Sequence, residues 1–88
     1  MQVEFLSQFN RDLDKIKAAH IKQAIFRAVI RTESAQKISD IPNVKKLAGH
    51  KSAYRIRIGD YRIGIFVYGA VAQYARVVHR KDIYKLFP

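Results

Sequence analysis

The spacing of apolar residues changes half-way along the chain, and this change limits the folds that the chain can adopt. Before residue 45, apolar residues recur every three or four positions, as on one side of an amphipathic helix. Beyond it they alternate with polar residues, most strictly over residues 54–58, which is the period of a strand with one buried face. In a chain of 88 residues, the two patterns predict one domain of the α+β class over residues 1–88.

The first half of the chain predicts a short strand followed by two helices. Residues 1–6 alternate apolar and polar side chains, as a strand does. Ser7 fits the N-cap of a first helix over residues 8–18. A second apolar stripe predicts an antiparallel partner helix over residues 20–37. The helical pattern ends before Pro42, because proline disfavours helix in the residue that precedes it.

The second half predicts an antiparallel meander of three strands. Gly59 followed by Asp60 suits a type II′ hairpin turn, which would place Arg57 opposite Arg62. Alternation then assigns the core side of this hairpin to apolar residues, namely Tyr54, Ile56, Ile58, Tyr61, Ile63, Ile65 and Val67.

The next turn can be predicted from the cost of burial. A two-residue loop would direct Arg76 into the core, and an unpaired buried arginine is costly. We therefore expect a three-residue loop at residues 69–71. Two antiparallel helices then cover one side of a mostly antiparallel sheet (β-α-α-β-β-β), and the other side is open and basic. This choice places Gln73, Ala75 and Val77 inside, and Ala72, Tyr74, Arg76, Val78 and Arg80 on the basic side.

The positive charge is concentrated in the second half. Seventeen Lys and Arg against seven Asp and Glu give a net charge of +10. Residues 1–44 hold seven basic and five acidic side chains, a net of +2, whereas residues 45–88 hold ten and two, a net of +8. Such a charge repels itself in the folded state, which favours a polyanion or an acidic protein as partner. A basic surface that serves only solubility is the alternative.

The arginine-bearing side of the sheet is suited to phosphate. Arg57 opposite Arg62 would be a destabilising pair, by up to about 1 kcal/mol, and the planar guanidinium group matches phosphate oxygens. Phe66, Tyr68 and Tyr74 on the same side would suit the stacking of bases in single-stranded RNA or DNA. The alternative is a solvated strand face whose charges deter edge pairing.

Titratable side chains gather just after the last predicted strand. His79 is a candidate general base at neutral pH, Arg80 a stabiliser of negative charge, and Tyr84 a proton donor or acceptor. Each has a structural alternative: His79 has the parity of a core-facing histidine, and Tyr84 could cover the core beside Phe87.

Other classes of protein are excluded by what the chain lacks. Without cysteine it has no disulfide, thiol chemistry or Cys-ligated zinc site. His20, His50 and His79 are too scattered for a metal set, so we expect neither a metal nor a cofactor. No apolar run approaches the roughly 20 residues that span a bilayer, and Glu4 interrupts any secretory signal. We therefore expect a cytoplasmic protein without membrane contact.

Three motifs carry a family resemblance over nearly the full chain. They are LAG at residues 47–49, YRIRIGDYR at residues 54–62 and HRKDIY at residues 79–84. In this order and spacing the sequence resembles the RelE/ParE superfamily of bacterial and archaeal toxin–antitoxin systems. The resemblance implies a microbial-RNase-like RelE fold. It also implies a type II toxin that inhibits translation as a ribosome-dependent, metal-independent endoribonuclease (mRNA interferase), cutting mRNA in the ribosomal A site.

The resemblance also implies roles for individual residues. Arg55 and Arg57 match strand residues that hold the RNA backbone, and Arg62 matches the arginine that stabilises the crowded phosphate. Arg80 matches an arginine that assists the leaving group, and Tyr84 matches the tyrosine assigned as general base. Lys45, Lys46 and Lys51 are expected as further contacts to the RNA backbone.

The implied partners are a cognate acidic antitoxin, the ribosome and mRNA, with operator DNA bound only through the antitoxin complex. The main alternative is a ParE-like DNA gyrase inhibitor without nuclease activity, and another is an inactive binding module on the same fold. The set Arg62, Arg80 and Tyr84 favours the nuclease, because the ParE branch generally lacks it.

Overall fold

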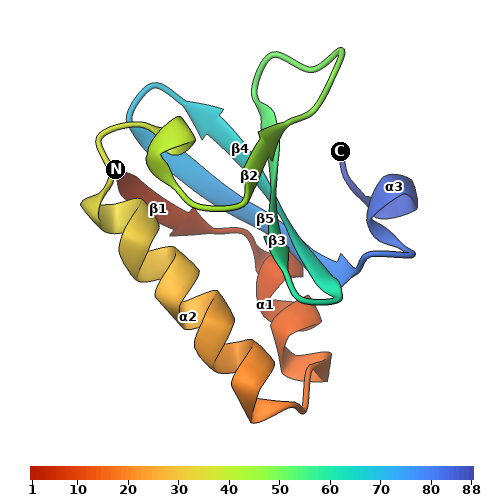
Figure 1. The fold of residues 1–88 in the computed structure, drawn as a ribbon. Coiled ribbons are helices and arrows are strands. Elements are labelled where there is room, and N and C mark those ends of the chain that lie inside the picture. Colours follow the sequence, from red (N-terminus) through yellow and green to blue (C-terminus); the bar gives the residue numbers. More distant parts are fainter.

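The computed structural model describes all of residues 1–88 and has helices on both sides of a single five-stranded sheet (Figure 1). The α+β class and the mostly antiparallel sheet are confirmed, and the structure adds a short strand β2 and a short helix α3. In chain order the elements are β1 (Gln2–Phe5), α1 (Ser7–Lys15), α2 (Ala19–Ser34), the 3₁₀ turn η1 (Ile38–Asp40), β2 (Val44–Lys46), β3 (Ala53–Ile58), β4 (Tyr61–Tyr68), β5 (Val71–His79) and α3 (Ile83–Leu86).

The strands lie in the order β1-β5-β4-β3-β2, and only β1 runs parallel to its neighbour, β5. The predicted hairpin is confirmed: Arg57 pairs with Arg62, and Ile58 pairs with Tyr61. Gly59 has a φ of 56°, the positive value that the first position of a type II′ turn requires. This turn fixes the register of β3 against β4, and hence which side chains share a side of the sheet.

The two long helices differ in detail from the prediction. Helix α1 begins at Ser7 itself, because Leu6 occupies the N-cap position without a side-chain hydrogen bond. Helix α2 ends at Ser34, not at residue 37. From the link between them the helices run in opposite directions and diverge, α1 packing on β5 and α2 across β1 and β3 (Figure 1). None of the helices combines the length and apolar composition needed to cross a membrane.

The predicted three-residue loop before β5 is wrong. Tyr68 pairs with Val71, so that only residues 69 and 70 form the turn. The prediction had treated β5 as a strand of uniform parity, in which a two-residue turn would bury Arg76. In the structure, a change of register within the β4–β5 pairing keeps Arg76 out of the core.

A β-bulge between Gly64 and Ile65 changes the parity of β5 part-way along. Arg76 pairs with Gly64 and Tyr74 pairs with Ile65, which leaves Ala75 as the extra residue. The first part of β5 therefore buries Tyr74, and the second part still keeps Arg76 out of the core. The predicted burial was wrong for Ala72, Gln73, Tyr74 and Ala75 relative to the main core, and right for Val77.

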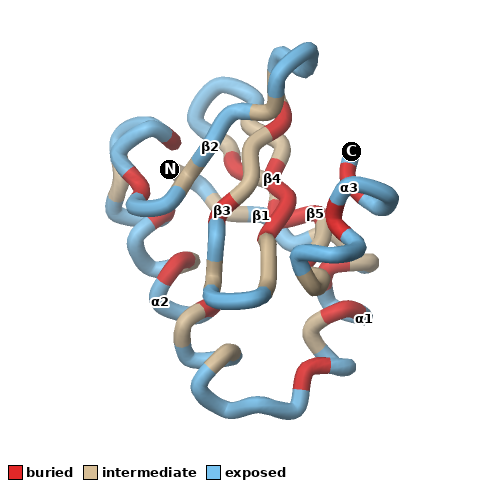
Figure 2. The backbone as a smooth tube through the Cα atoms, turned by 45° about the vertical axis from the view of Figure 1, so that its right-hand side comes forward, coloured by how far each residue is buried: buried red, intermediate tan, exposed pale blue.

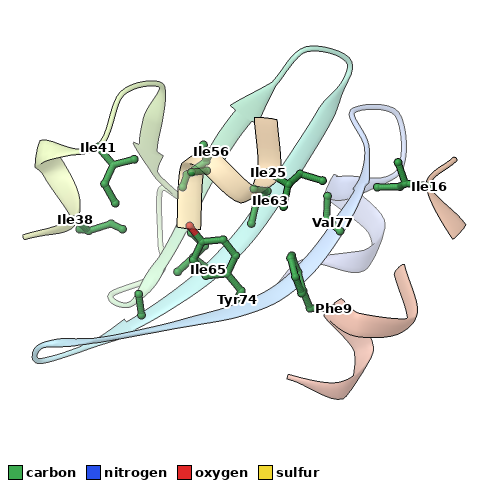
Figure 3. Close-up of a cluster of buried hydrophobic side chains, with 12 residues drawn as sticks. Phe9, Ile16, Ile25, Ile38, Ile41, Ile56, Ile63, Ile65, Tyr74 and Val77 are labelled. Carbon is green, nitrogen blue, oxygen red and sulfur yellow. The ribbon is translucent and has the colours of Figure 1, made fainter. Parts of the chain in front are cut away.

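The main core lies between the helices and the sheet (Figure 3). Tyr74 is fully buried there, and its hydroxyl shares a 2.7 Å hydrogen bond with that of Thr32 on α2. The predicted core side of the hairpin is confirmed, since all seven residues are buried in this core or packed against it. The buried residues of the main core are Phe9, Ile16, Ile25, Ala28, Ile38, Ile41, Ile56, Ile63, Ile65, Ala72, Tyr74 and Val77.

One acidic residue of α1 is buried, although the helical pattern predicts it on the solvent face. Asp12 accepts hydrogen bonds from Nε of Arg76 (2.7 Å), Nη2 of Arg76 (3.1 Å) and the backbone N–H of Val77 (3.1 Å). Arg76 thus joins α1 to β5 and does not belong to the basic side of the sheet. A buried carboxylate with this many donors is satisfied, whereas removing Arg76 would leave it unpaired.

A second, smaller core covers part of the other side of the sheet. Ile83 and Phe87 pack there on Ala53 and Ala75. Figure 2 shows the C-terminal segment with α3 beside the strands, exposed over most of its length. The ring of Phe87 lies directly on Gly64, where a Cβ atom would come within 2.6 Å of its Cδ1. The C-terminal segment is therefore held against the sheet by packing. The rest of this side of the sheet, opposite the main core, carries the arginines.

Candidate nucleic-acid interface

Beside the C-terminal segment lies a hollow of about 330 Å³, which we term the basic hollow. Its residues come from the turn before β2 and from β2, β3, β4 and α3. It is lined by Asn43, Val44, Lys45, Arg55, Arg57, Arg62 and Tyr84.

Strand register explains why the cations meet. Lys45 pairs with Arg55, and Arg57 pairs with Arg62, so alternate residues of three neighbouring strands share one side of the sheet. None of the seven acidic residues lines the hollow. The ion pairs in the structure are Arg76 with Asp12 and Arg80 with Asp60. The four cations of the hollow, from Lys45 to Arg62, therefore have no carboxylate partner. Their mutual repulsion would be relieved by a bound polyanion.

Arg62 is held in place by its own hairpin. Its Nη1 donates hydrogen bonds to the carbonyl oxygens of Gly59 (2.8 Å) and Tyr61 (2.9 Å). The Nε and Nη2 groups remain available as donors. A guanidinium group fixed in this way is a preorganised site for an anion, because little side-chain freedom is left to lose on binding.

Tyr84 lies at the edge of the basic hollow and is 76% exposed. The guanidinium carbon of Arg55 is 4.7 Å from the centre of its ring. Hydrogen bonding from Arg55 and the positive charge of Arg55 lower the pKa of Tyr84 below its ordinary value of 10.0, and Lys45 and Arg62 act in the same direction. Nearby positive charges favour the phenolate over the neutral phenol, which is the physical cause of this shift.

Three predicted site residues lie outside the basic hollow. Arg80 follows β5 beside the hairpin turn, where its backbone N–H donates to the carbonyl of Asp60 (2.8 Å) and its Nε is 4.0 Å from Oδ1 of Asp60. Its side chain is exposed. Lys46 and Lys51 line a separate shallow hollow in the loop between β2 and β3. The structure thus brings together Lys45, Arg55, Arg57, Arg62 and Tyr84. The roles predicted for all eight residues remain predictions.

The expected base-stacking aromatic residues are mostly unavailable. Tyr74 is buried in the main core, and the ring of Phe66 packs against that of Phe87 at 4.9 Å. Only Tyr68 is largely exposed. The structural alternative for His79 is supported, because its ring packs edge-on against Tyr61 (5.8 Å) and its Nδ1 accepts the backbone N–H of Lys81 (3.2 Å).

Asn43 is a lining residue that the sequence analysis missed. It has a φ of 65°, a left-handed conformation that asparagine tolerates better than most residues. It turns the chain into β2, and its carbonyl accepts the N–H of Arg57 (3.2 Å). The sequence signal was Asn43 directly after Pro42, a typical turn pair, but it did not reveal the strand that follows.

The basic hollow is suited to binding phosphate and to stabilising negative charge that develops on it. No three His, Asp or Glu side chains are grouped so that they could hold a metal ion.

Comparison with known proteins decides the family. A family model described as the ParE toxin of a type II toxin–antitoxin system (parDE) matches residues 3–84. The chain belongs to this toxin family.

Relatives place the toxin within the family. It is 38% identical to Toxin RelE3 of Methanocaldococcus jannaschii over 89 residues, which cover all of both chains. The RelE chain in a RelB–RelE antitoxin–toxin complex from Methanococcus jannaschii is 35% identical, with a TM-score of 0.83 over 97% of the toxin and 99% of that chain. The intact Escherichia coli RelBE complex shares the fold at 17% identity and a TM-score of 0.70, over 89% and 94% of the two chains. This protein is therefore a RelE-like toxin of a type II toxin–antitoxin system.

Proposed function

We propose that this toxin is a ribosome-dependent endoribonuclease that cuts mRNA in the A site without a metal ion and so inhibits translation. The supporting observation is the convergence of Arg55, Arg57, Arg62 and Tyr84 on one hollow that no carboxylate lines. A phosphodiester in this hollow would meet fixed cationic donors and a tyrosine with a lowered pKa.

The reaction follows from these groups. The 2′-hydroxyl of the substrate attacks the adjacent phosphorus in line, the bond from phosphorus to the 5′-oxygen breaks, and a 2′,3′-cyclic phosphate remains. Tyr84 as phenolate accepts the proton of the 2′-hydroxyl, and the leaving 5′-oxygen takes a proton from water. Arg62 stabilises the charge that builds on the nonbridging oxygens, and Arg55 and Arg57 hold the backbone. Arg80 lies outside the hollow, at the end of β5, and its proposed role is to assist the leaving group.

The proposed partners are the ribosome, mRNA and a cognate acidic antitoxin, with operator DNA reached only through the antitoxin complex. The net charge of +10 favours an acidic partner, and relatives from Methanococcus jannaschii and Pyrococcus horikoshii form complexes with RelB. An apolar groove between α1 and α2, flanked by the exposed side chains of Phe5 and Phe26, offers the antitoxin a second kind of contact.

A translation extract with a defined messenger tests the proposal. We expect cuts in the messenger only when ribosomes are present, and we expect added antitoxin to stop them. Arg62→Ala should lower the cleavage rate by 10² to 10³, about 3 kcal/mol, because it removes one stabilising donor. Arg80→Ala should also impair cleavage and relieve growth arrest.

Arg11→Ala is the matched control, since it removes an exposed arginine of α1 that lines no part of the hollow. All variants should unfold at nearly the same temperature as the parent. Retained cleavage in both Arg62→Ala and Arg80→Ala would defeat the assigned site. Intact messenger together with DNA breaks that depend on gyrase would favour the ParE-like alternative, which the family model keeps in view.

A further inference from the structure

A second hollow, of about 210 Å³, lies next to the basic hollow and is also rimmed by arginine. We term it the α2 hollow, because Arg27 and Arg31 of helix α2 line it together with Arg57 of β3. Arg57 and Asn43 line both hollows. The two hollows therefore adjoin at Asn43 and Arg57.

The arginines of the α2 hollow have no partner within the fold. Arg27 and Arg31 are exposed, stand one helical turn apart, and lie within 4.0 Å of no carboxylate oxygen. Like charges at this spacing destabilise a helix, and Arg57 adds a third positive charge. No acidic residue lines the hollow. An arrangement that costs stability and serves no internal contact indicates a ligand of opposite charge.

The floor of the α2 hollow is apolar and closely packed. Ala28, Ile41 and Ile56 are buried there, and Gly59 contributes no side chain. The three guanidinium groups can therefore bind an anion above an uncharged floor. Arginine presents a planar set of donors that binds two oxygens of one phosphate at once.

We propose that the α2 hollow binds a second phosphodiester of RNA, beyond the phosphates held in the basic hollow. The inference rests on the proposed function for the identity of the polyanion. RNA is favoured over an acidic protein because Arg57 lines both hollows, so that a strand with one phosphate per nucleotide can reach from the basic hollow into the α2 hollow. The phosphodiester can belong to the strand in the basic hollow or to ribosomal RNA.

The double variant Arg27→Gln/Arg31→Gln tests the proposal with RNA that cannot be cut. The probes are 2′-O-methyl oligonucleotides, one just long enough to fill the basic hollow and one several nucleotides longer. We expect the variant to bind the longer probe roughly tenfold more weakly and the shorter probe as the parent does. The slope of log affinity against log salt should fall by about 0.7, because the variant loses one phosphate contact.

Arg11→Gln/Lys22→Gln is the matched control. It removes two exposed positive charges from α1 and α2 that line neither hollow. The control should bind both probes as the parent does, and both double variants should unfold at the parent's temperature. Equal losses in the two double variants would overturn the proposal, since the effect would then come from net charge alone.

Two further results separate the sources of the phosphate. Weaker binding of the longer probe assigns it to the same strand. Unchanged probe binding with weaker co-sedimentation with ribosomes assigns it to ribosomal RNA. Unchanged binding in both assays, or a loss confined to the antitoxin complex, overturns the proposal. Because the probes cannot be cut, these results do not depend on the nuclease activity, and failure of either hypothesis can be recognised separately.

Discussion

Arg55 and Tyr84 form the contact on which the chemistry of the basic hollow depends. The guanidinium group lies 4.7 Å from the ring centre, and it lowers the pKa of Tyr84. A lowered pKa increases the share of phenolate at neutral pH, which is the form that can accept a proton. Tyr84 is nevertheless exposed, so its altered acidity comes from its cationic neighbours and not from burial.

Removing the charge of Arg55 should raise the pKa of Tyr84. We expect Arg55→Gln to move the titration of Tyr84 to higher pH, followed by phenolate absorbance as the difference between each protein and its Tyr84→Phe counterpart. If phenolate is the base, the cleavage rate rises with pH up to this pKa, and in Arg55→Gln the rise should start at higher pH. Arg57→Gln is the control, because Arg57 is not among the groups that lower the pKa of Tyr84. Identical titration in parent and Arg55→Gln would contradict the mechanism.

Among the α-helices, α3 is the shortest and the most dependent on its packing against the sheet. Its four residues are too few to be stable alone, and it stays in place through the burial of Ile83 and Phe87. Gly64 makes this possible, since any side chain there would collide with Phe87. The position of Tyr84 over the basic hollow is thus determined by a glycine on the central strand β4.

Gly64→Ala should release α3 from the sheet. We expect the variant to lose about 1 to 3 kcal/mol of stability through overpacking, and the pKa of Tyr84 to return toward its ordinary value as the residue leaves Arg55. Faster proteolysis at the C-terminal end would report the same release. Phe87→Ala should free Tyr84 as well, because it removes the ring that packs on Gly64. A Gly64→Ala protein that keeps the lowered pKa of Tyr84 would show that α3 is held by other contacts.

Elements fixed by neighbours in the sequence were predictable, and elements fixed by distant residues were not. Gly59 and strict alternation determine the first hairpin locally, so its register and the meeting of Arg57 with Arg62 could be predicted. The bulge at Ala75 has no comparable local signal. Asp12 has the pattern of a solvent-facing residue and is buried only because Arg76 pairs with it from 64 positions away. The convergence of Tyr84 on Arg55 likewise depends on how Phe87 packs.

At the scale of the whole molecule, Tyr74 is the residue through which the layers contact one another. Its ring lies 5.5 Å from that of Phe9 on α1 and 5.7 Å from that of Phe5 on β1. Its hydroxyl bonds to Thr32 on α2. Burial is the main cause that raises the pKa of Tyr74 to about 12. Because β5 carries this residue into the core, its ionisation state affects the stability of the entire fold.

Alkaline pH should therefore destabilise the toxin through Tyr74. The folded state holds the phenol proton more tightly than the unfolded chain, so the contribution is complete below about pH 10 and is lost as the pH rises toward 12. Two pKa units correspond to about 3 kcal/mol. We expect Tyr74→Phe to be about 1 kcal/mol less stable at neutral pH and to show a flatter alkaline decline in denaturant titrations. Tyr68→Phe, which removes an exposed phenol, should decline as the parent does; equal slopes in all three proteins would refute the assignment.

The parallel pairing of β1 with β5 has a consequence for the timing of synthesis. Residues 2–5 leave the ribosome long before their sole sheet partner, residues 71–74, has been made. A nascent chain can form its long helices early, but at that stage β1 has no partner strand and Tyr84 has not been made. The toxin therefore closes its interior only after residues 71–74 have been synthesised, and it completes its set of reactive groups only after Tyr84.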